Sequence, residues 1–358
     1  MPFGVMTVTL QDVSMLTDLP IQGSPIGPSM IDLNWHENLA QRFQLVLPNQ
    51  EVNLNITTNK GHGPQLQWLK LFRLERMVDD YTPYQLARHL EAYLLWLFGW
   101  VMFTSSHGDI VDARWIPHAR AIADNELDDI PQLSWGSAIL CWTYRELCQA
   151  CVRKKPNSNM TCMPLLVNLW SYERFQVGHP YIQPKQYTAE MYVADMIDRL
   201  TMGSHWTRRR PQWGRLQVRS TYEAFTEQFD HMRPKHVTWE PYSQYAIYHK
   251  SRGLGISEAC YQDSMYWMMR KKLMFDVFVE DYTVHRVMMQ FGLRQEVPVP
   301  WGNLVEAGVH VYKMQGPRKP LIDLMRRMQP GIDGWGQALH DRVEEQAPFD
   351  MGSYEAYL

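Results

Sequence analysis

Apolar side chains recur every three to four positions in several stretches of the chain, which is the period of an α-helix with one buried face. Two of these stretches open with a capping box, Thr9 with Asp12 and Thr82 with Gln85. Pro83 occupies the first helical position of the second stretch, where its missing N–H has no partner to lose. We therefore expect helices to begin at both points, the second running for about 20 residues.

Helical patterns continue along the rest of the chain. They comprise "SWGSAILCWTYRELCQACVRKK", the stretch after a third capping box "STYE" at 220–223, "MYWMMRKKLMFDVFVEDY", and "TVHRVMMQFGL" with Gly292 as its C-cap. Strand signals are confined to the short stretches "GVMTVTL" and "NLNITT". Because strands and helices do not alternate, the pattern predicts a mostly α fold: a single large helical domain with at most a few short strands.

Two stretches lack helical periodicity and are predicted to be loops, 105–130 and the proline-rich 298–320. The second divides the expected organisation into three parts. These are a body over 1–300, a Pro-rich linker over 301–320, and a C-terminal helical extension over 321–358, with one helix around "WGQALHDRVEEQ".

Composition narrows the class of protein. The chain has 358 residues, 45% of them hydrophobic, with 14 Trp and 22 Met to fill a core. Its net charge of −3 excludes a protein that binds nucleic acid over its whole surface, so any such role must sit in a local patch. The longest apolar run, 93–103, is too short to span a bilayer, and no signal-peptide pattern opens the chain. We expect no membrane contact.

Cysteine usage points to a reducing, intracellular setting, because the count of five is odd. Cys148 and Cys151 are three positions apart in a helical pattern, which favours a core or half-buried helix face over a zinc site. The basic cluster Arg270, Lys271 and Lys272 is interpreted as the solvated face of a helix.

The sequence contains few features that would indicate an enzyme. No G-x-G-x-x-G, P-loop, H-E-x-x-H or G-x-S-x-G motif is present, and we expect no cofactor and no metal. Acidic clusters at 79–80 and 126–129 would need a third carboxylate to hold a catalytic metal as in a transposase, and solvated charge is the favoured interpretation. Lys250 is interpreted as an ordinary solvated lysine.

The stretch "PLLVNLWSYERFQVGHPYIQP" (164–184) sets an adjacent acid and base in an aromatic helix. Neighbouring residues of a helix point about 100° apart, so Glu173 and Arg174 cannot pair well and each needs a partner elsewhere. Catalysis would want further titratable groups close by, which the local sequence lacks. We expect a structural latch in which Glu173 or Arg174 ties the helix end to another element, with Trp170 and Tyr172 packed beneath.

One interval, between Asp198 and Glu223, contains no acid. It interleaves tryptophans with arginines, a combination used for phosphate contact and base stacking. The alternative is a basic loop that packs Trp206 and Trp213 inward and leaves its arginines in water or against an acidic partner. The candidate residues for a nucleic-acid or anionic-partner surface are Arg208, Arg209, Arg210, Arg215 and Arg219.

Five stretches, in order, resemble signatures of the plant mobile domain family, also called the aminotransferase-like plant mobile domain. They are "FGVMTVTLQDVSMLTDLPIQGSPI", "LSWGSAILCWTYRELCQAC", "LLVNLWSYERFQVGHP", "MRPKHVTWEPY" and "VMMQFGLRQEVP", and they span about residues 2–300. Relatives usually carry further helical sequence before "PFG", so a short natural form or a trimmed one is expected. A pyridoxal phosphate site would require a Schiff-base lysine in a phosphate cup, for which only Lys250 has a Ser/Gly-rich setting.

The resemblance implies a nuclear, non-enzymatic module of the maintenance-of-meristems-like group. Such proteins are associated with transposon silencing, gene expression, genome stability and meristem maintenance. Protein partners are implied, among them a serine/threonine phosphatase-like relative or another plant mobile domain protein, and nucleic acid is a further candidate. The phosphatase metal motifs found in fused relatives are absent. The alternative function is an enzyme derived from a transposable element, a cryptic nuclease or transferase.

Overall fold

The structure is a computed structural model, and its described part excludes several stretches of the chain. It describes residues 4–29, 32–46, 62–73, 80–105, 108–152, 160–175, 180–182, 200–206, 209–210, 218–295, 321–335, 340 and 342–343. Within these ranges helices predominate and the strands form two small sheets, which confirms the expected mostly α fold. No helix of the described part is both long and apolar enough to cross a bilayer.

Helices account for most of the described elements. The α-helices are α1 (Leu10–Thr17), α2 (Trp35–Phe43), α3 (Leu66–Leu69), α4 (Pro83–Leu97), α5 (Ile116–Asp124), α6 (Trp135–Val152), α7 (Pro164–Arg174), α9 (Val218–Asp230), α10 (Gln244–Lys250), α11 (Ala259–Gln262) and α13 (Leu321–Trp335). A π-helical turn, η4 (Phe98–Met102), extends α4. Short 3₁₀ turns are η2 (Lys70–Phe72), η5 (Ala113–Trp115), η6 (Leu127–Asp129), η7 (Met202–Trp206), η8 (Pro234–His236), η9 (Ser264–Tyr266), η10 (Val284–Arg286) and η11 (Met288–Phe291).

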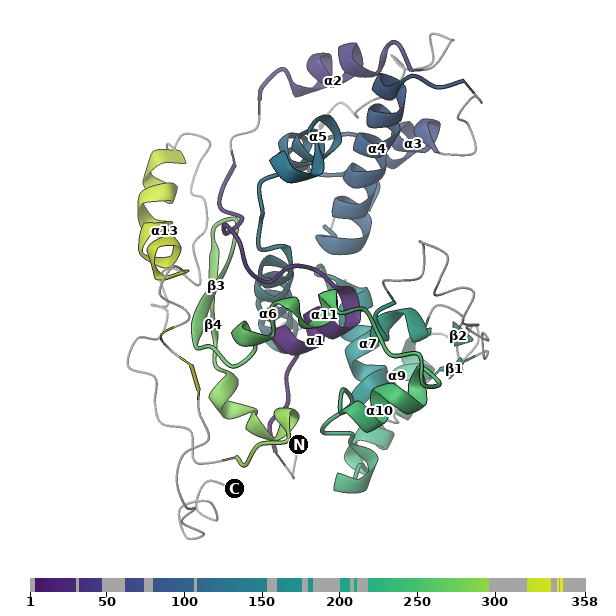
Figure 1. The fold of residues 1–358 in the computed structure, drawn as a ribbon, viewed down its shortest axis with the longest axis vertical. Coiled ribbons are helices and arrows are strands. Elements are labelled where there is room, and N and C mark those ends of the chain that lie inside the picture. The colour runs from purple at the N-terminus through teal and green to yellow at the C-terminus, as the bar shows by residue number, and fades with distance from the viewer. Residues whose placement is uncertain are drawn as a thin grey trace.

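The four described strands pair in two antiparallel two-stranded sheets. Strands β1 (Tyr181–Ile182) and β2 (Arg209–Arg210) form one, and β3 (Lys271–Phe275) and β4 (Phe278–Tyr282) form the other. Figure 1 shows α2, α3, α4 and α5 gathered at one end of the molecule, α1, α6, α7 and α11 near its middle, and α13 beside the β3–β4 hairpin. The chain start therefore lies among elements from the middle and the end of the sequence.

One continuous apolar core links both ends of the molecule. Its centre is a stack of aromatic rings from distant segments. The ring of Phe103 lies 4.7 Å from that of Phe275 in β3 and 4.4 Å from that of Trp115, nearly parallel to both. Phe98 stacks on Trp135 at 4.8 Å. Such offset stacks add specific geometry to the area they bury, so they fix the α4–α5 end against α6 and the hairpin.

Local capping signals from the sequence are confirmed where they were clearest. The side chains of Thr9 and Thr82 each accept a hydrogen bond from the backbone N–H of the third helical residue. In return, the side chain of that third residue accepts a hydrogen bond from the backbone N–H of the threonine. Gly292 adopts a left-handed conformation, φ 70°, at the end of η11. The long helix predicted from "SWGSAILCWTYRELCQAC" is α6. Each cap is formed by residues within one helical turn of each other, so a short stretch of sequence is enough to predict it.

The prediction of a helix through "MYWMMRKKLMFDVFVEDY" is wrong, because residues 271–282 form the β3–β4 hairpin. Its two-residue loop begins at Asp276, whose φ of 52° is left-handed. Helix α6 packs against both strands and α13 against β3. A strand covered on both faces has no alternating pattern, and a short apolar run of that kind resembles a buried helix.

The basic cluster at the start of this hairpin is also not a solvated helix face. Lys271 is buried, and its Nζ donates to the carbonyl oxygen of Ile21 at 3.2 Å. The same Nζ lies 3.9 Å from the ring centre of Trp335 in α13, a cation–π contact. Lys272 pairs with Asp281 across the strands at 3.2 Å.

Several further predictions of local structure are wrong. Residues 4–9 belong to neither described sheet, α9 begins at 218 ahead of the expected cap at 220, and α5 lies inside the predicted loop 105–130. Helix α13 ends at Trp335, and most of the helix predicted around "WGQALHDRVEEQ" lies outside the described residues. Cys148 and Cys151 are exposed rather than half-buried. The predicted strand "NLNITT" and the linker 301–320 lie outside the described residues.

Candidate functional site

A buried carboxylate at the start of α1 forms the centre of the site. Asp12 is the third residue of the helix, and its side chain is completely inaccessible to solvent. The backbone N–H and the hydroxyl of Thr9 donate to Oδ2 of Asp12 at 2.8 and 2.7 Å, and the N–H of Asp12 donates to the Thr9 hydroxyl at 3.2 Å. The capping box thus occupies one of the two carboxylate oxygens.

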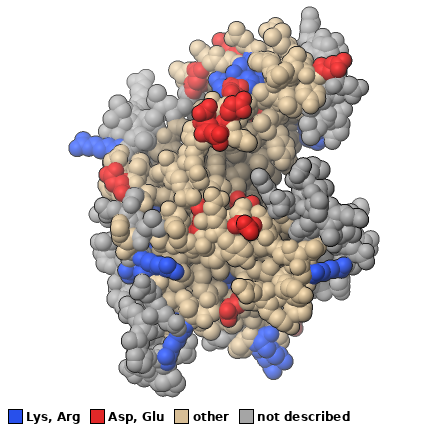
Figure 2. Space-filling view, viewed as in Figure 1, with Lys and Arg blue, Asp and Glu red and all other residues tan. Residues whose placement is uncertain are grey.

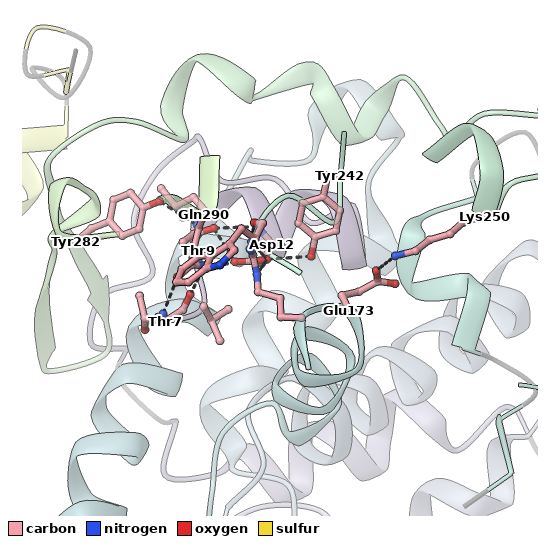
Figure 3. Close-up of polar contacts among 12 residues, drawn as sticks. Thr7, Thr9, Asp12, Glu173, Tyr242, Lys250, Tyr282 and Gln290 are labelled. Atoms are coloured by element: carbon pink, nitrogen blue, oxygen red, sulfur yellow. Dashed lines mark hydrogen bonds and ion pairs between the residues drawn. The ribbon is translucent and has the colours of Figure 1, made fainter. Parts of the chain in front are cut away.

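Arg174, the last residue of α7, occupies the other oxygen. Its Nη2 and Nε donate to Oδ1 of Asp12 at 2.7 and 3.2 Å, and the hydroxyl of Tyr242 donates to the same oxygen at 2.9 Å (Figure 3). The third guanidinium nitrogen, Nη1, donates to the carbonyl oxygen of Trp239 at 2.6 Å. One buried ion pair therefore joins α1, α7 and the segment before α10.

Glu173 has a separate set of partners, on other elements. Its Oε1 accepts a hydrogen bond from the indole Nε1 of Trp206 in η7 at 2.7 Å, and Oε2 is paired with Nζ of Lys250 at the end of α10. Glu173 is buried, whereas 29% of the Lys250 side chain is exposed. The interpretation of Lys250 as an ordinary solvated lysine is wrong, since it neutralises a buried carboxylate.

The segment that precedes α1 is held by side chains from across the fold. The amide of Gln290 donates to the carbonyl oxygen of Thr7 at 2.9 Å and accepts from its N–H at 2.8 Å, as a neighbouring strand would. The hydroxyl of Tyr144 donates to the Val8 carbonyl oxygen at 2.6 Å. The hydroxyl of Tyr282 accepts the first N–H of α1 at 3.2 Å (Figure 3). These contacts satisfy backbone groups that a sheet would otherwise satisfy.

Burial governs the ionisation of the groups around Asp12. It raises the pKa of Tyr242 well above the usual value, and the nearby Asp12 carboxylate raises it further. Burial likewise raises the pKa of Tyr144 and Tyr282. All three phenols remain protonated donors at neutral pH. Because donors meet both oxygens of Asp12, the carboxylate is placed to hold elements together and poorly placed to accept a proton from a substrate.

A small pocket adjoins the Glu173–Lys250 pair. It is lined by Lys250, His205, Thr201, Ser204 and Ser251 among others, and it encloses about 20 Å³, room for roughly one water molecule. Burial lowers the pKa of His205, although the Glu173 carboxylate acts in the opposite direction. Cofactor sites usually measure about 300–1,000 Å³, so neither a nucleotide nor pyridoxal phosphate fits here. Among the described residues, no group of three or more His, Cys, Asp or Glu side chains is placed to hold a metal ion.

The two aromatic residues of the expected latch lie beside these ion pairs. Trp170 and Tyr172 are partly buried against the main core. The ring of Tyr172 lies 5.1 Å from that of Trp206, and the ring of Trp170 meets that of Phe175 edge-on at 5.2 Å. The structure therefore brings together the four predicted residues with Asp12, Trp206, Tyr242 and Lys250.

The arginines of the predicted basic surface are described only in part. Arg208 and Arg215 lie outside the described residues. Arg209 and Arg210 form β2, and Arg219 lies in the first turn of α9, with the backbone alone described for all three. Figure 1 places the β1–β2 pair at the edge of the molecule near α9. Trp206, one of the two expected loop anchors, is buried, and Trp213 lies outside the described residues.

The partners of the Glu173–Arg174 pair were missed by sequence reasoning. Asp12 was visible only as a capping residue, which predicts an exposed helix end as readily as a buried one. Tyr242 lies 230 positions from Asp12, and Lys250 lies 77 from Glu173. The sequence did contain one signal for the site, the acid of the capping box. One carboxylate oxygen of an Asp at that position bonds to the backbone, which leaves the other oxygen for a distant partner.

Comparison with known proteins identifies the family. A sequence profile of the plant mobile domain matches residues 1–347. The chain belongs to the plant mobile domain family. The match extends beyond the expected body at 1–300 and includes α13, and it confirms the family resemblance of the five sequence stretches. No solved structure matches this chain.

Relatives of this plant mobile domain chain occur in Arabidopsis thaliana. It is 29% identical to the "Serine/threonine-protein phosphatase 7 long form homolog" over 318 residues, 88% of this chain and 22% of that protein. It is 30% identical to "Protein MAIN-LIKE 1" over 183 residues, 50% of this chain and 33% of that protein. With "Protein MAINTENANCE OF MERISTEMS" the identity is 25% over 300 residues, 83% of this chain and 54% of that protein. The chain thus matches only about a fifth to a half of each relative's length.

Proposed function

We propose that this plant mobile domain chain is a non-enzymatic nuclear module in transposon silencing and gene expression regulation, with consequences for genome stability and meristem maintenance. It acts through protein partners. The observation that carries the proposal is the family match over residues 1–347, and it is supported by the similarity to a protein named for the maintenance of meristems. The saturated Asp12 and Glu173 carboxylates support a scaffolding role for the centre of the domain.

The cellular proposal is tested by tagging the chain in plant cells, depleting it, and measuring transcripts of genes and transposable elements. We expect the tagged chain in the nucleus and raised transposon transcripts after depletion, restored by the wild-type chain. Exclusion from the nucleus together with unchanged transcripts would contradict the proposal. Cleavage of DNA by the purified chain with Mg²⁺ would favour the transposon-derived enzyme instead.

The Glu173–Arg174 motif is proposed to be a structural latch within this module. Its support is the pair of contacts to α1 and α10, both remote in sequence from α7. A latch requires stability and function to fail together. Variants of Arg174 that unfold in vitro should therefore also lose the cellular activity, whereas a stable variant without activity would indicate a binding site.

The basic segment is proposed to be the surface that meets an anionic partner, with nucleic acid or an acidic protein face as the candidates. Its support is the sequence interval without acids that contains Arg208, Arg209, Arg210, Arg215 and Arg219. We expect binding to duplex or single-stranded DNA to be weak and to fall steeply with salt, since phosphate contacts release counterions.

The matched test compares two triple variants with the same change in charge. Arg208→Glu, Arg209→Glu, Arg210→Glu removes the segment's charge, and Lys235→Glu, Arg286→Glu, Arg326→Glu changes three exposed residues elsewhere. The first should lose binding and its salt dependence while the second keeps both. Equal binding by both variants would make the segment a solvated loop. Candidate protein ligands include the phosphatase-named relative and other plant mobile domain proteins.

The division into a body at 1–300, a linker at 301–320 and an extension at 321–358 is likewise kept as a proposal. Helix α13, at the start of the extension, packs against β3 through Met328, which joins Met274 and Val279 in a small apolar cluster. Limited proteolysis tests the boundary: cleavage within 301–320 should leave the body and α13 associated. Cleavage confined to the body would contradict it.

A further inference from the structure

The five cysteines divide into two groups by their exposure. Cys141, Cys162 and Cys260 are buried, and burial raises the pKa of each of these thiols. Cys148 and Cys151, near the end of α6, are exposed. An oxidant in solution reaches exposed thiols most readily, and the thiolate is the form that reacts. Oxidation of this chain should therefore begin at Cys148 and Cys151.

Cys148 and Cys151 lie on the same face of α6. Residues three apart in an α-helix have Cα atoms about 5 Å apart and Cβ atoms about 5–6 Å apart. A disulfide requires roughly 4.4–6.8 Å between the Cα atoms and roughly 3.5–4.5 Å between the Cβ atoms. The backbone spacing of the pair is thus already suitable, and the Cβ atoms need to approach each other by only about 1–2 Å.

The end of α6 can accommodate this approach. The helix ends at Val152, one residue beyond Cys151. The last four carbonyl groups of a helix have no N–H partner within that helix, so the final turn is held by fewer hydrogen bonds than a turn in the middle. A small adjustment of the backbone around Cys151 therefore costs less free energy than the same adjustment inside a helix.

The electrostatic surroundings of the pair set the rate of its oxidation. Burial raises the pKa of Cys148, Glu280 and Cys151 raise it further, and Arg145 acts in the opposite direction. The effect of Cys151 on Cys148 requires the two sulfur atoms to be close. Highly reactive thiols sit in electropositive surroundings, whereas the described Lys and Arg side chains lie apart from one another on the face in Figure 2. We expect slow oxidation under sustained exposure to an oxidant.

We propose that Cys148 and Cys151 form a redox site, a dithiol at the end of α6 that hydrogen peroxide converts to an intramolecular disulfide. One thiolate attacks a peroxide oxygen, so that an S–O bond forms, the O–O bond breaks, and the released hydroxide takes up the proton of that thiol as water. The second thiolate attacks the sulfur of the resulting sulfenic acid, an S–S bond forms, the S–O bond breaks, and a second water molecule leaves. Two electrons pass from the sulfur atoms to the peroxide.

The disulfide is reversible, because a small thiol such as glutathione reduces it by thiol–disulfide exchange. Inside cells a disulfide of this kind is transient, which suits a group that senses oxidants. The proposal does not depend on the proposed nuclear function.

The test exposes the reduced full-length chain to hydrogen peroxide, blocks the remaining thiols with a maleimide, and digests the protein with trypsin. Cleavage after Arg145 and Arg153 gives one peptide, 146–153, that contains both Cys148 and Cys151. An intramolecular disulfide lowers the mass of this peptide by two hydrogen atoms and prevents its labelling. We expect it to be the main oxidised product, and we expect glutathione to restore both thiols.

A matched control variant carries the same number of exposed thiols at a different spacing. Ala150→Cys with Cys151→Ser places the second thiol two residues from Cys148, about 200° around the helix, and Ala150 is itself exposed. This variant should form little intramolecular disulfide and should instead accumulate sulfinic acid or disulfides between two chains. Circular dichroism verifies that it is folded.

Three results would overturn the proposal. The first is a wild-type chain whose exposed thiols stay reduced, or end as sulfinic acid or as disulfides between two chains. The second is oxidation of Cys141, Cys162 or Cys260 before the exposed pair. The third is a control variant that closes its disulfide as readily as wild type, because helix geometry would then not be what brings the two thiols together.

Discussion

Nη2 of Arg174 lies 2.7 Å from Oδ1 of Asp12, although 162 positions separate the two residues in the chain. Both side chains are fully buried. The same carboxylate caps α1 through Thr9 and accepts a hydrogen bond from Tyr242. An acid whose local role is to begin a helix is therefore also the point at which α7 and the segment before α10 are fixed to the start of the chain.

Removal of Arg174 should destabilise the fold strongly. Arg174→Ala leaves Asp12 buried without its cation, for which a loss of about 3–5 kcal/mol in unfolding free energy is expected. That exceeds the roughly 1–3 kcal/mol expected for an ordinary buried polar partner. Urea denaturation gives the value, and Arg286→Ala, at an exposed arginine, is the control. A change below about 1 kcal/mol would mean that the pair does not hold the fold.

Loss of Lys250 should have a smaller effect of the same sign. Lys250→Met leaves the Glu173 carboxylate buried without its cation, although the Trp206 indole still donates to it, and this should cost about 1–3 kcal/mol. Adding Glu173→Gln should recover part of the loss, because the amide is neutral. Thermal and chemical denaturation measure both, with Lys235→Met as the exposed control. If the double variant is less stable than Lys250→Met alone, Lys250 does not act through Glu173.

Lys271 should make stability rise with pH. Burial lowers its pKa from 10.5 to about 7, so between those values the unfolded chain holds a proton that the folded chain has released. Unfolding free energy should therefore increase from about pH 7 towards pH 10.5. Lys271→Met should lack this rise and be more stable than wild type near pH 6. Denaturation curves at a series of pH values test it, and parallel profiles for the two proteins would contradict the buried amine.

Glu280, on the neighbouring strand, should act in the opposite direction. Burial raises its pKa from 4.5 to about 7, with Arg145 opposing that shift, so the folded chain keeps a proton that the unfolded chain loses in this range. Stability should therefore fall as pH rises from about 4.5 to 7. Glu280→Gln should reduce this fall in unfolding free energy between about pH 4.5 and 7 and leave the rise above pH 7 unchanged. A steeper fall in the variant would show that Glu280 is charged in the folded state.

The sequence predicts what one turn of backbone or one helix face determines, and little beyond it. The capping boxes at Thr9 and Thr82 and the left-handed Gly292 involve neighbours a few residues apart. The need of Glu173 and Arg174 for separate partners also follows from helix geometry alone. The choice of Asp12 and Lys250 does not, because it depends on how α1, α7 and α10 pack.

Burial on two sides explains the other failures. Strands β3 and β4 are covered by α6 and α13, so their sequence lacks the alternation that marks a strand, and Lys271 is buried by the same packing. Helix α4 was predicted correctly as a helix, but its charged residues Arg88 and Glu91 are buried because α2 and α5 supply their ion-pair partners, while Leu90 is exposed. A hydrophobic pattern identifies a face that needs cover and does not say which surface covers it.

The most direct test of the latch is a double-mutant cycle on Asp12 and Arg174, with unfolding free energies for wild type, Asp12→Asn, Arg174→Met and the double variant. Asp12→Asn also weakens the cap and the Tyr242 bond, and the cycle cancels those effects. The account predicts a coupling energy of about 2–3 kcal/mol between the two side chains. The double variant should therefore lose less unfolding free energy than the two single variants lose together. If the loss in the double variant equals the sum of the two single losses to within about 0.5 kcal/mol, the two side chains are independent and the latch is contradicted.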